Sequence, residues 1–168
     1  MNGRLKRTIL VVYQSGTGGT RQLVNAFVQG ASTSNDVLVR VQLAHHTTAL
    51  DIEQSDAYVF ATPEYLGSMG GLMKDMFDRT YYDLLDRLSG RPYACLICAG
   101  SDGQGAARQL TRIATGWRLR ALADPLIVNV QAQTTSAIQR DKQLTTQQQQ
   151  PCHDLGLLFS SGLAMGIF

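Results

Sequence analysis

The sequence of 168 residues carries almost no excess of either charge: 15 lysine and arginine residues stand against 13 acidic ones. A formal net charge of +2 is too small to favour nucleic acid as a partner. No apolar run reaches the roughly 20 residues that a membrane span requires. The apolar C-terminal stretch, residues 155–168, is broken by Ser160, Ser161 and Gly162. These absences predict a soluble protein that binds neither nucleic acid nor a membrane.

Cysteine is also scarce, and three cysteines cannot form the even-numbered framework of a small secreted domain. Cys95 and Cys98 lie three residues apart in an apolar, strand-like run, so we expect their side chains to point to opposite faces and not to form a disulfide. The basic residues Arg4, Lys6 and Arg7 precede an apolar run that is too short for a signal peptide. We therefore expect a cytoplasmic protein.

The sequence does contain a regular alternation of strand-like and helix-like segments. Short apolar runs predict strands at residues 8–13, 37–43, 57–62, 93–99 and 126–130. Helical periodicity predicts helices over residues 23–31, 72–77, 106–117 and 155–163, the last with Pro151 in its first turn. The run 37–43 alternates in polarity and predicts an edge strand, whereas the other runs suit a sheet covered on both faces. The alternation predicts an α/β, doubly wound sheet in a single domain, residues 1–168.

The first strand leads into a loop rich in glycine and hydroxyl residues, Gln14-Ser15-Gly16-Thr17-Gly18-Gly19-Thr20-Arg21. A loop between a strand and a helix directs its amides and the helix N-terminus at one place, where a phosphate is favoured. Arg21 and Gln22 stand where a Walker A motif requires glycine and lysine, and a dinucleotide fingerprint lacks its third glycine at position 21. The loop predicts a mononucleotide site, with a ligand-free glycine turn as the alternative.

The segment Ser15 to Thr20 resembles the flavodoxin phosphate-loop pattern Ser/Thr-x-Thr-Gly-x-Thr, and it lies directly after the first strand, as that pattern requires. The resemblance implies a flavodoxin-like fold: a five-stranded parallel sheet in the order 2-1-3-4-5, with helices on both faces. It also implies that the phosphate of flavin mononucleotide (FMN) is bound, without a required cation, by amides and hydroxyls of Ser15, Gly16, Thr17, Gly18, Gly19 and Thr20. Arg21 is then expected to be a solvated helix residue.

The third strand ends in a second loop, Thr62-Pro63-Glu64-Tyr65-Leu66-Gly67-Ser68-Met69-Gly70-Gly71-Leu72. It is similar to the T-P-E-Y-N-x-S-x-P-G-x-L-K-N loop of NAD(P)H-dependent FMN reductases, with Leu66 in place of Asn and Gly70 in place of Pro. It is also similar in placement to the flavin loop of quinone reductases of the tryptophan-repressor-binding type. The resemblance implies flavin contacts from Thr62, Pro63, Glu64, Tyr65, Leu66 and Gly67. A Tyr65 that only packs over the end of the sheet is the alternative.

The fourth strand ends in Ala99-Gly100-Ser101-Asp102-Gly103-Gln104-Gly105, at the place of the third flavin-contacting loop of this family. The resemblance implies cofactor contacts from Ala99, Gly100, Ser101 and Gly103. Asp102 is expected to accept hydrogen bonds from the exposed amides of the helix that follows.

Two other features predict no site of their own. The polar tract 131–150, which ends in four glutamines, is expected to be a surface excursion of undetermined helical content. His45, His46 and His153 show no metal-ligand spacing with the cysteines, so solvated or capping roles are expected.

The resemblance implies an oxidoreductase in which NADPH or NADH reduces FMN and two electrons pass to a small-molecule, quinone-like acceptor, with no catalytic side chain required. Two other classes stay open. One is a flavodoxin-type electron carrier, which the slightly basic composition disfavours because such carriers tend to be strongly acidic. The other is a cofactor-free interaction module. The sequence does not determine the electron acceptor or the choice between NADH and NADPH. It also leaves the oligomeric state open, with a homodimer and a homotetramer as the two candidates.

Overall fold

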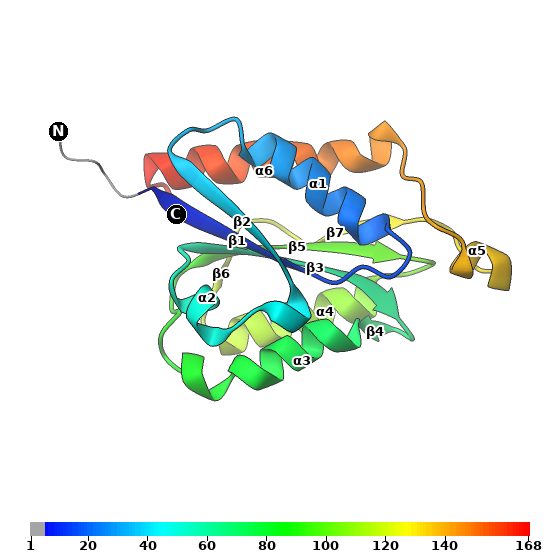
Figure 1. Cartoon of the computed structure of the whole chain (residues 1–168), viewed down its shortest axis with the longest axis horizontal. Helices are drawn as coiled ribbons and strands as arrows, with labels where there is room; N and C mark the ends of the chain where they lie inside the picture. Colours follow the sequence, from blue (N-terminus) through cyan, green and yellow to red (C-terminus); the bar gives the residue numbers. More distant parts are fainter. Residues whose placement is uncertain (1–5) are drawn as a thin grey trace.

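A twisted β-sheet forms the middle layer of the protein, and helices cover both of its faces (Figure 1). The computed structural model describes residues 6–168, so Arg4 lies outside the described residues. The strands are β1 (Arg7–Tyr13), β2 (Val37–Leu43), β3 (Ala57–Tyr65), β4 (Ser68–Met69), β5 (Pro92–Ala99), β6 (Arg120–Ala121) and β7 (Leu126–Asn129). The helices are α1 (Gly19–Ala31), α2 (Ala49–Glu53), α3 (Gly71–Thr80), α4 (Gln104–Gly116), α5 (Thr135–Gln139) and α6 (Thr146–Met165).

The sheet has the order β2-β1-β3-β5, with both β6 and β7 paired to β5, and these pairs are parallel. This confirms the predicted fold class and the order of the five longer strands. The described residues form seven strands rather than five, because β4 returns antiparallel on β3 and the last position is divided into β6 and β7. Pro125 lies directly before β7 and has no N–H to donate, so the ladder is interrupted there.

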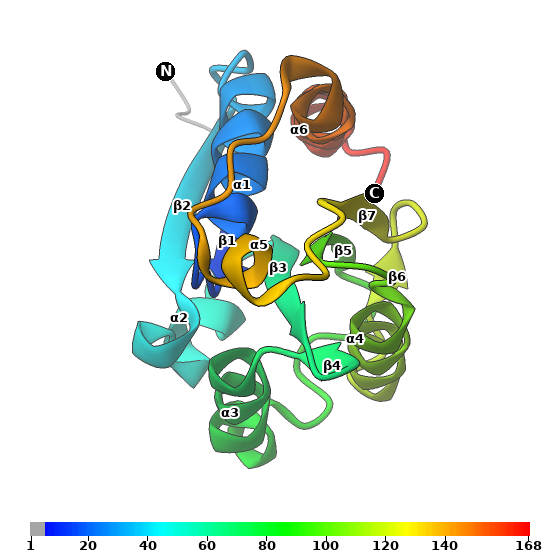
Figure 2. The ribbon, with the colours of Figure 1, turned by 90° about the vertical axis from the view of Figure 1, so that its right-hand side faces the viewer.

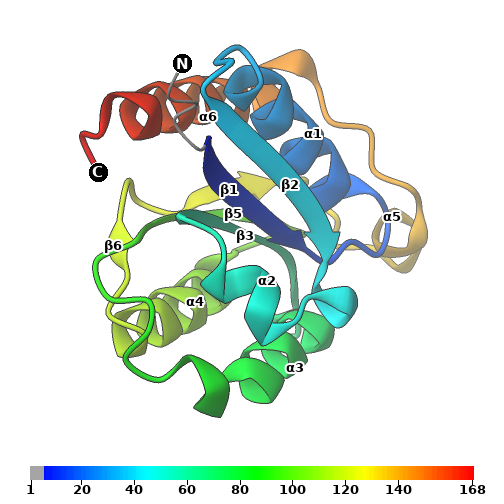
Figure 3. The ribbon, with the colours of Figure 1, turned by 60° about the vertical axis from the view of Figure 1, so that its left-hand side comes forward.

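Strand β2 is the outermost strand on its side, as its alternating sequence predicts (Figure 3). The expected wetter face is partly covered, because Arg40 Nη2 and Gln42 Nε2 donate to Asp51 Oδ1 of α2 at 2.8 and 3.1 Å. Val41 on the other face is 44% exposed. Both faces of this edge strand are therefore partly wet.

Two hydrophobic cores lie on opposite faces of the sheet, one beneath α3 and α4 and one beneath α1 and α6. Cys95 belongs to the first core and Cys98 to the second, and all three cysteines are free and buried. The prediction that Cys95 and Cys98 point to opposite faces is confirmed. Since β5 is buried along its whole length, its side chains must fill both cores.

Helices α1 and α6 pack with their backbones in direct contact. A Cβ atom on Gly30 of α1 would overlap the carbonyl oxygen of His153, and one on Gly156 of α6 would overlap that of Phe27. Helix α6 therefore lies against the helix that follows the first glycine-rich loop, and glycine is required on both sides of the contact.

Helix α6 begins at Thr146, five residues before Pro151, so the prediction that Pro151 lies in its first turn is wrong. Thr145 Oγ1 accepts from the amide of Gln148 at 3.2 Å, and Gln148 Oε1 accepts from the amide of Thr145 at 2.9 Å. This reciprocal cap fixes the start of the helix, whereas the glutamines that follow give no apolar period. Among residues 6–168, no helix has both the length and the apolar character needed to cross a bilayer.

Candidate functional site

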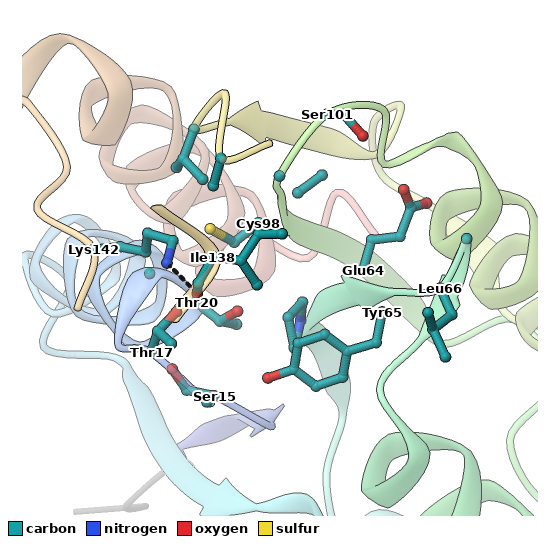
Figure 4. Close-up of a pocket in the computed structure, with 18 residues that line it drawn as sticks. Ser15, Thr17, Thr20, Glu64, Tyr65, Leu66, Cys98, Ser101, Ile138 and Lys142 are labelled. Atoms are coloured by element: carbon teal, nitrogen blue, oxygen red, sulfur yellow. Dashed lines mark hydrogen bonds between the residues drawn. The ribbon is translucent and has the colours of Figure 1, made fainter. Parts of the chain in front are cut away.

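A cavity of about 530 Å³ lies at the carboxyl ends of β1, β3 and β5 (Figure 4). Open parallel sheets place their ligands at this edge, because loops from neighbouring strands meet there. Predicted residues from all three loops line the cavity: Ser15, Gly16, Thr17, Gly19 and Thr20 from the first, Pro63, Glu64, Tyr65, Leu66 and Gly67 from the second, and Ala99, Gly100 and Ser101 from the third.

The first loop has the geometry of an anion site. Gly18 precedes α1 with a φ of 84°, a left-handed conformation that favours glycine. Ser15 Oγ accepts from the amide of Arg21 at 3.3 Å, and the Arg21 side chain is exposed, as predicted. Within residues 6–168, no hydrogen bond uses the amides of residues 15–18 or the hydroxyls of Thr17 and Thr20. These donors are free to bind a ligand.

Three predicted site residues lie outside this cavity. Gly18 lines a neighbouring hollow that shares Ser15, Gly16 and Thr17 with the cavity. Thr62 is completely buried, where its hydroxyl donates to the carbonyl of Pro63 and accepts from the amide of Gly70. Gly103 precedes α4 with a φ of 89°. Thr62 and Gly103 therefore shape the second and third loops rather than line the cavity.

Glu64 caps helix α4. Its Oε1 accepts from the amide of Gly103 at 2.8 Å, and its Oε2 accepts from the amide of Ala106 at 3.0 Å. The predicted capping role of Asp102 is wrong, since the residue before α4 is Gly103 and no side chain of its own loop caps the helix. A carboxylate 39 residues earlier in the chain binds those amides, and it thereby joins the second loop to the third.

The second loop is a β-hairpin with Leu66 and Gly67 at its tip, both at positive φ (52° and 72°). This conformation is strained for leucine, and the Leu66 side chain is 106% exposed, so no packing compensates the strain. Gln109 of α4 holds the hairpin by accepting from the amide of Met69 at 2.8 Å. A Cβ atom on Gly105 would overlap the carbonyl oxygen of Gly67, so the hairpin tip rests directly on α4.

Tyr65 forms one wall of the cavity, and its ring points across the cavity toward Ser15 (Figure 4). A Cβ atom on Gly16 would overlap its hydroxyl, so a larger residue at position 16 would displace the ring from this place. Tyr65 is 44% exposed, and burial of the remainder, together with the nearby Cys98, raises the pKa of its hydroxyl. An aromatic face is thus available at the mouth of the cavity.

The sequence analysis missed five residues that line the cavity: Cys98, Val130, Ala132, Ile138 and Lys142. Four of them belong to the segment that follows β7, most of which was expected to be a surface excursion. Figure 2 looks onto the carboxyl end of the sheet, with α5 lying in front of it. No periodicity marks these residues as cavity residues. Only Val130, at the carboxyl end of the last predicted strand, could have been assigned to this edge of the sheet from the sequence. Among residues 6–168, no three metal-ligating side chains gather into a metal site.

The sheet order and the helices on both faces define a flavodoxin-like α/β protein. A family model described as NADPH-dependent FMN reductase matches residues 47–133, just over half of the chain. The chain belongs to this family. The first loop precedes the matched region, so the prediction that it binds a phosphate depends on the geometry of the loop itself.

Individual relatives agree with this fold. A flavodoxin of Aquifex aeolicus is 26% identical over 97 residues, which span 58% of this chain and 52%, about half, of that protein. The structure of a flavodoxin from the domain Archaea has a TM-score of 0.76 at 18% identity and covers 93% of this chain and 98% of its own. A flavodoxin, WrbA-like protein from Agrobacterium tumefaciens has a TM-score of 0.69 at 13% identity, covering 96% of this chain and 99% of its own.

Proposed function

We propose that this protein binds FMN in the cavity at the carboxyl end of the sheet and acts as an NAD(P)H-dependent oxidoreductase. The observation that carries the proposal is the set of unused donors in the first loop, the amides of residues 15–18 and the hydroxyls of Thr17 and Thr20, beside a cavity of about 530 Å³. Family membership supports the same cofactor. Bound FMN would supply the redox chemistry, which is acceptance of a hydride from NADPH or NADH and transfer of two electrons to a quinone-like small molecule.

The residues of the chain bind and orient this cofactor. The first loop holds the phosphate with amides and hydroxyls near the N-terminus of α1, where partial positive charge favours an anion. The hairpin that carries Tyr65 and the loop at Ser101 line the cavity from different sides (Figure 4). Glu64 and Gln109 fix the hairpin to α4, which keeps this wall in place while ligands exchange.

An electron carrier is the second candidate function, and it is favoured by the Aquifex aeolicus relative, which is named a flavodoxin. The net charge of +2 argues against it, because a carrier that docks on basic partners gains from an acidic surface. We also propose a cytoplasmic location, which the three free thiols support.

Two measurements test the proposal. Fluorescence titration should give tight binding of FMN and much weaker binding of riboflavin, which lacks the phosphate. The FMN-loaded protein is then mixed anaerobically with NADPH or NADH and afterwards with a quinone, while flavin absorption is followed. Bleaching by a nicotinamide and recovery with the quinone support an enzyme. Reduction by dithionite alone supports a carrier, and absence of FMN binding supports a cofactor-free module.

A further inference from the structure

The segment 130–144, called the strap below, lies across the carboxyl end of the sheet and includes α5 (Figure 2). It is fixed rather than loose. The amide of Ala132 donates to the carbonyl of Gly100 at 2.8 Å, and the side chains of Ala132 and Leu144 are each only 9% exposed. The strap is therefore an ordered part of the cavity wall.

One side chain of α1 ties the strap to the phosphate loop. Gln22 Nε2 donates to the carbonyl oxygens of Gly18 (3.1 Å) and Lys142 (2.7 Å), and Gln22 Oε1 accepts from the amide of Leu144 (3.0 Å). The amide of Lys142 also donates to the carbonyl of Thr17 at 2.8 Å. These bonds hold residue 142 beside the phosphate loop, although 122 positions separate it from Thr20.

The side chain of Lys142 lies on the phosphate-loop side of the cavity, opposite Glu64 and Leu66 (Figure 4). Its Cβ and Cγ atoms are 3.5 Å from the position that a Cβ atom on Gly19 would occupy. Its ammonium group donates to the carbonyl oxygens of Ile138 (2.9 Å) and Arg140 (2.6 Å). An ammonium group has three donors, so these two carbonyls leave one proton available.

The charge of Lys142 has no carboxylate partner among residues 6–168. Glu64 is the other charged side chain that lines the cavity, and its two oxygens are bound to amides of α4. Lys142 also lines the neighbouring hollow of about 730 Å³ that Gly18 lines. A lysine with no acidic partner thus lies against a loop whose own donors are free.

We propose that Lys142 is a phosphate-recognition residue of this site, whose ammonium group donates to a dianionic phosphate monoester held by residues 15–20. The inference rests on the proposed function and extends it, because it assigns the recognition of phosphate partly to a cation from the strap. A phosphate that receives an N⁺–H donor in addition to amides and hydroxyls is bound more tightly than the uncharged end of riboflavin. The positive charge also makes FMN binding sensitive to salt.

The test compares the dissociation constants of FMN and riboflavin for four proteins: wild type, Lys142→Met, Lys142→Arg and Arg21→Met. Methionine keeps most of the aliphatic stem, arginine keeps the charge, and Arg21→Met is the matched control because Arg21 is exposed at the start of the same helix. Lys142→Met is expected to weaken FMN binding about tenfold and to leave riboflavin binding unchanged. Lys142→Arg should retain most of the FMN affinity, and Arg21→Met should change it less than about twofold.

Salt dependence gives a measurement that also uses the wild type. Raising the ionic strength should weaken FMN binding more in the wild type than in Lys142→Met. Equal losses of FMN and riboflavin affinity in Lys142→Met would identify a structural role for the strap and overturn the inference. Unchanged FMN affinity in that variant would overturn it too, while leaving the proposed function intact. A wild-type protein that does not bind FMN overturns both.

Discussion

Replacing Glu64 by alanine removes the acceptor for two amides at the start of α4, those of Gly103 and Ala106. Each bond joins an N–H group to a carboxylate, and such bonds contribute about 1.5–3 kcal/mol. Because Glu64 is only partly buried, the low end applies, and the two bonds together give about 3 kcal/mol. Glu64→Gln keeps one acceptor oxygen, so its loss should be about half as large.

Urea denaturation followed by circular dichroism measures both free energies of unfolding. Glu53→Gln is the matched control: it removes an exposed ion pair with Arg87, which should change stability by no more than about 0.5 kcal/mol. Hydrogen exchange adds a local measurement, since the amides of Gly103 and Ala106 should exchange faster in Glu64→Ala than in the wild type. Wild-type stability in Glu64→Ala, with unchanged exchange at those two amides, would refute the capping role.

Three further predictions concern single positions. Gly18→Val should abolish FMN binding while the sheet stays folded, because valine disfavours the φ of 84° at the phosphate loop; a folded variant by circular dichroism with wild-type FMN affinity would contradict it. Leu66→Asn should raise the free energy of unfolding by about 0.5–1 kcal/mol, since asparagine tolerates the φ of 52° and the lost side chain is exposed; unchanged or lower stability in urea would count against strain at the hairpin. Although burial pushes the pKa of Asp51 upward, hydrogen bonds from Thr48, Gln42 and Arg40 lower it to about 2. The ionised Asp51 should therefore stabilise the fold by about 1–2 kcal/mol above pH 3.8, and this contribution should be lost as the pH falls toward 2. The stability difference between wild type and Asp51→Asn should shrink over the same pH range, and a constant difference would exclude this origin.

The five longer strands were predictable because each is a short, largely apolar run with a definite end. Residues 37–43 and 57–62 lie within β2 and β3 as observed, and the alternation in the first of them placed it at the edge. Burial on both faces of β5 requires the continuous apolar sequence that marks it. The strands β4 and β6 were not predicted, because strands of two residues depend on the strands beside them and show no periodic pattern in the sequence.

The site was predictable where it is local and unpredictable where it is not. Residues 15–20 are contiguous between a strand and a helix, so the sequence alone could predict that their amides and hydroxyls lie together. The cap on α4 comes from Glu64, which is far from the helix in the sequence. The sequence prediction considered only acceptors next to the helix, so it assigned the cap to Asp102. The backbone of Lys142 is held beside the first loop by hydrogen bonds to Thr17 and Gln22. These residues are more than a hundred positions away in the sequence, and no local pattern predicts such a contact.

The contact between α1 and α6 has a consequence for the order in which the protein matures. The ribosome makes α1 well before α6, so the contact between Gly156 and Phe27 forms only after α6 has been made. A nascent chain that does not yet have α6 lacks the Phe159 ring, which packs edge-on against Phe27 in the folded protein, where Phe27 is completely buried. Loading of the proposed cofactor is therefore expected to follow synthesis of α6, because this helix completes the packing around α1, which begins directly after the loop at residues 15–18.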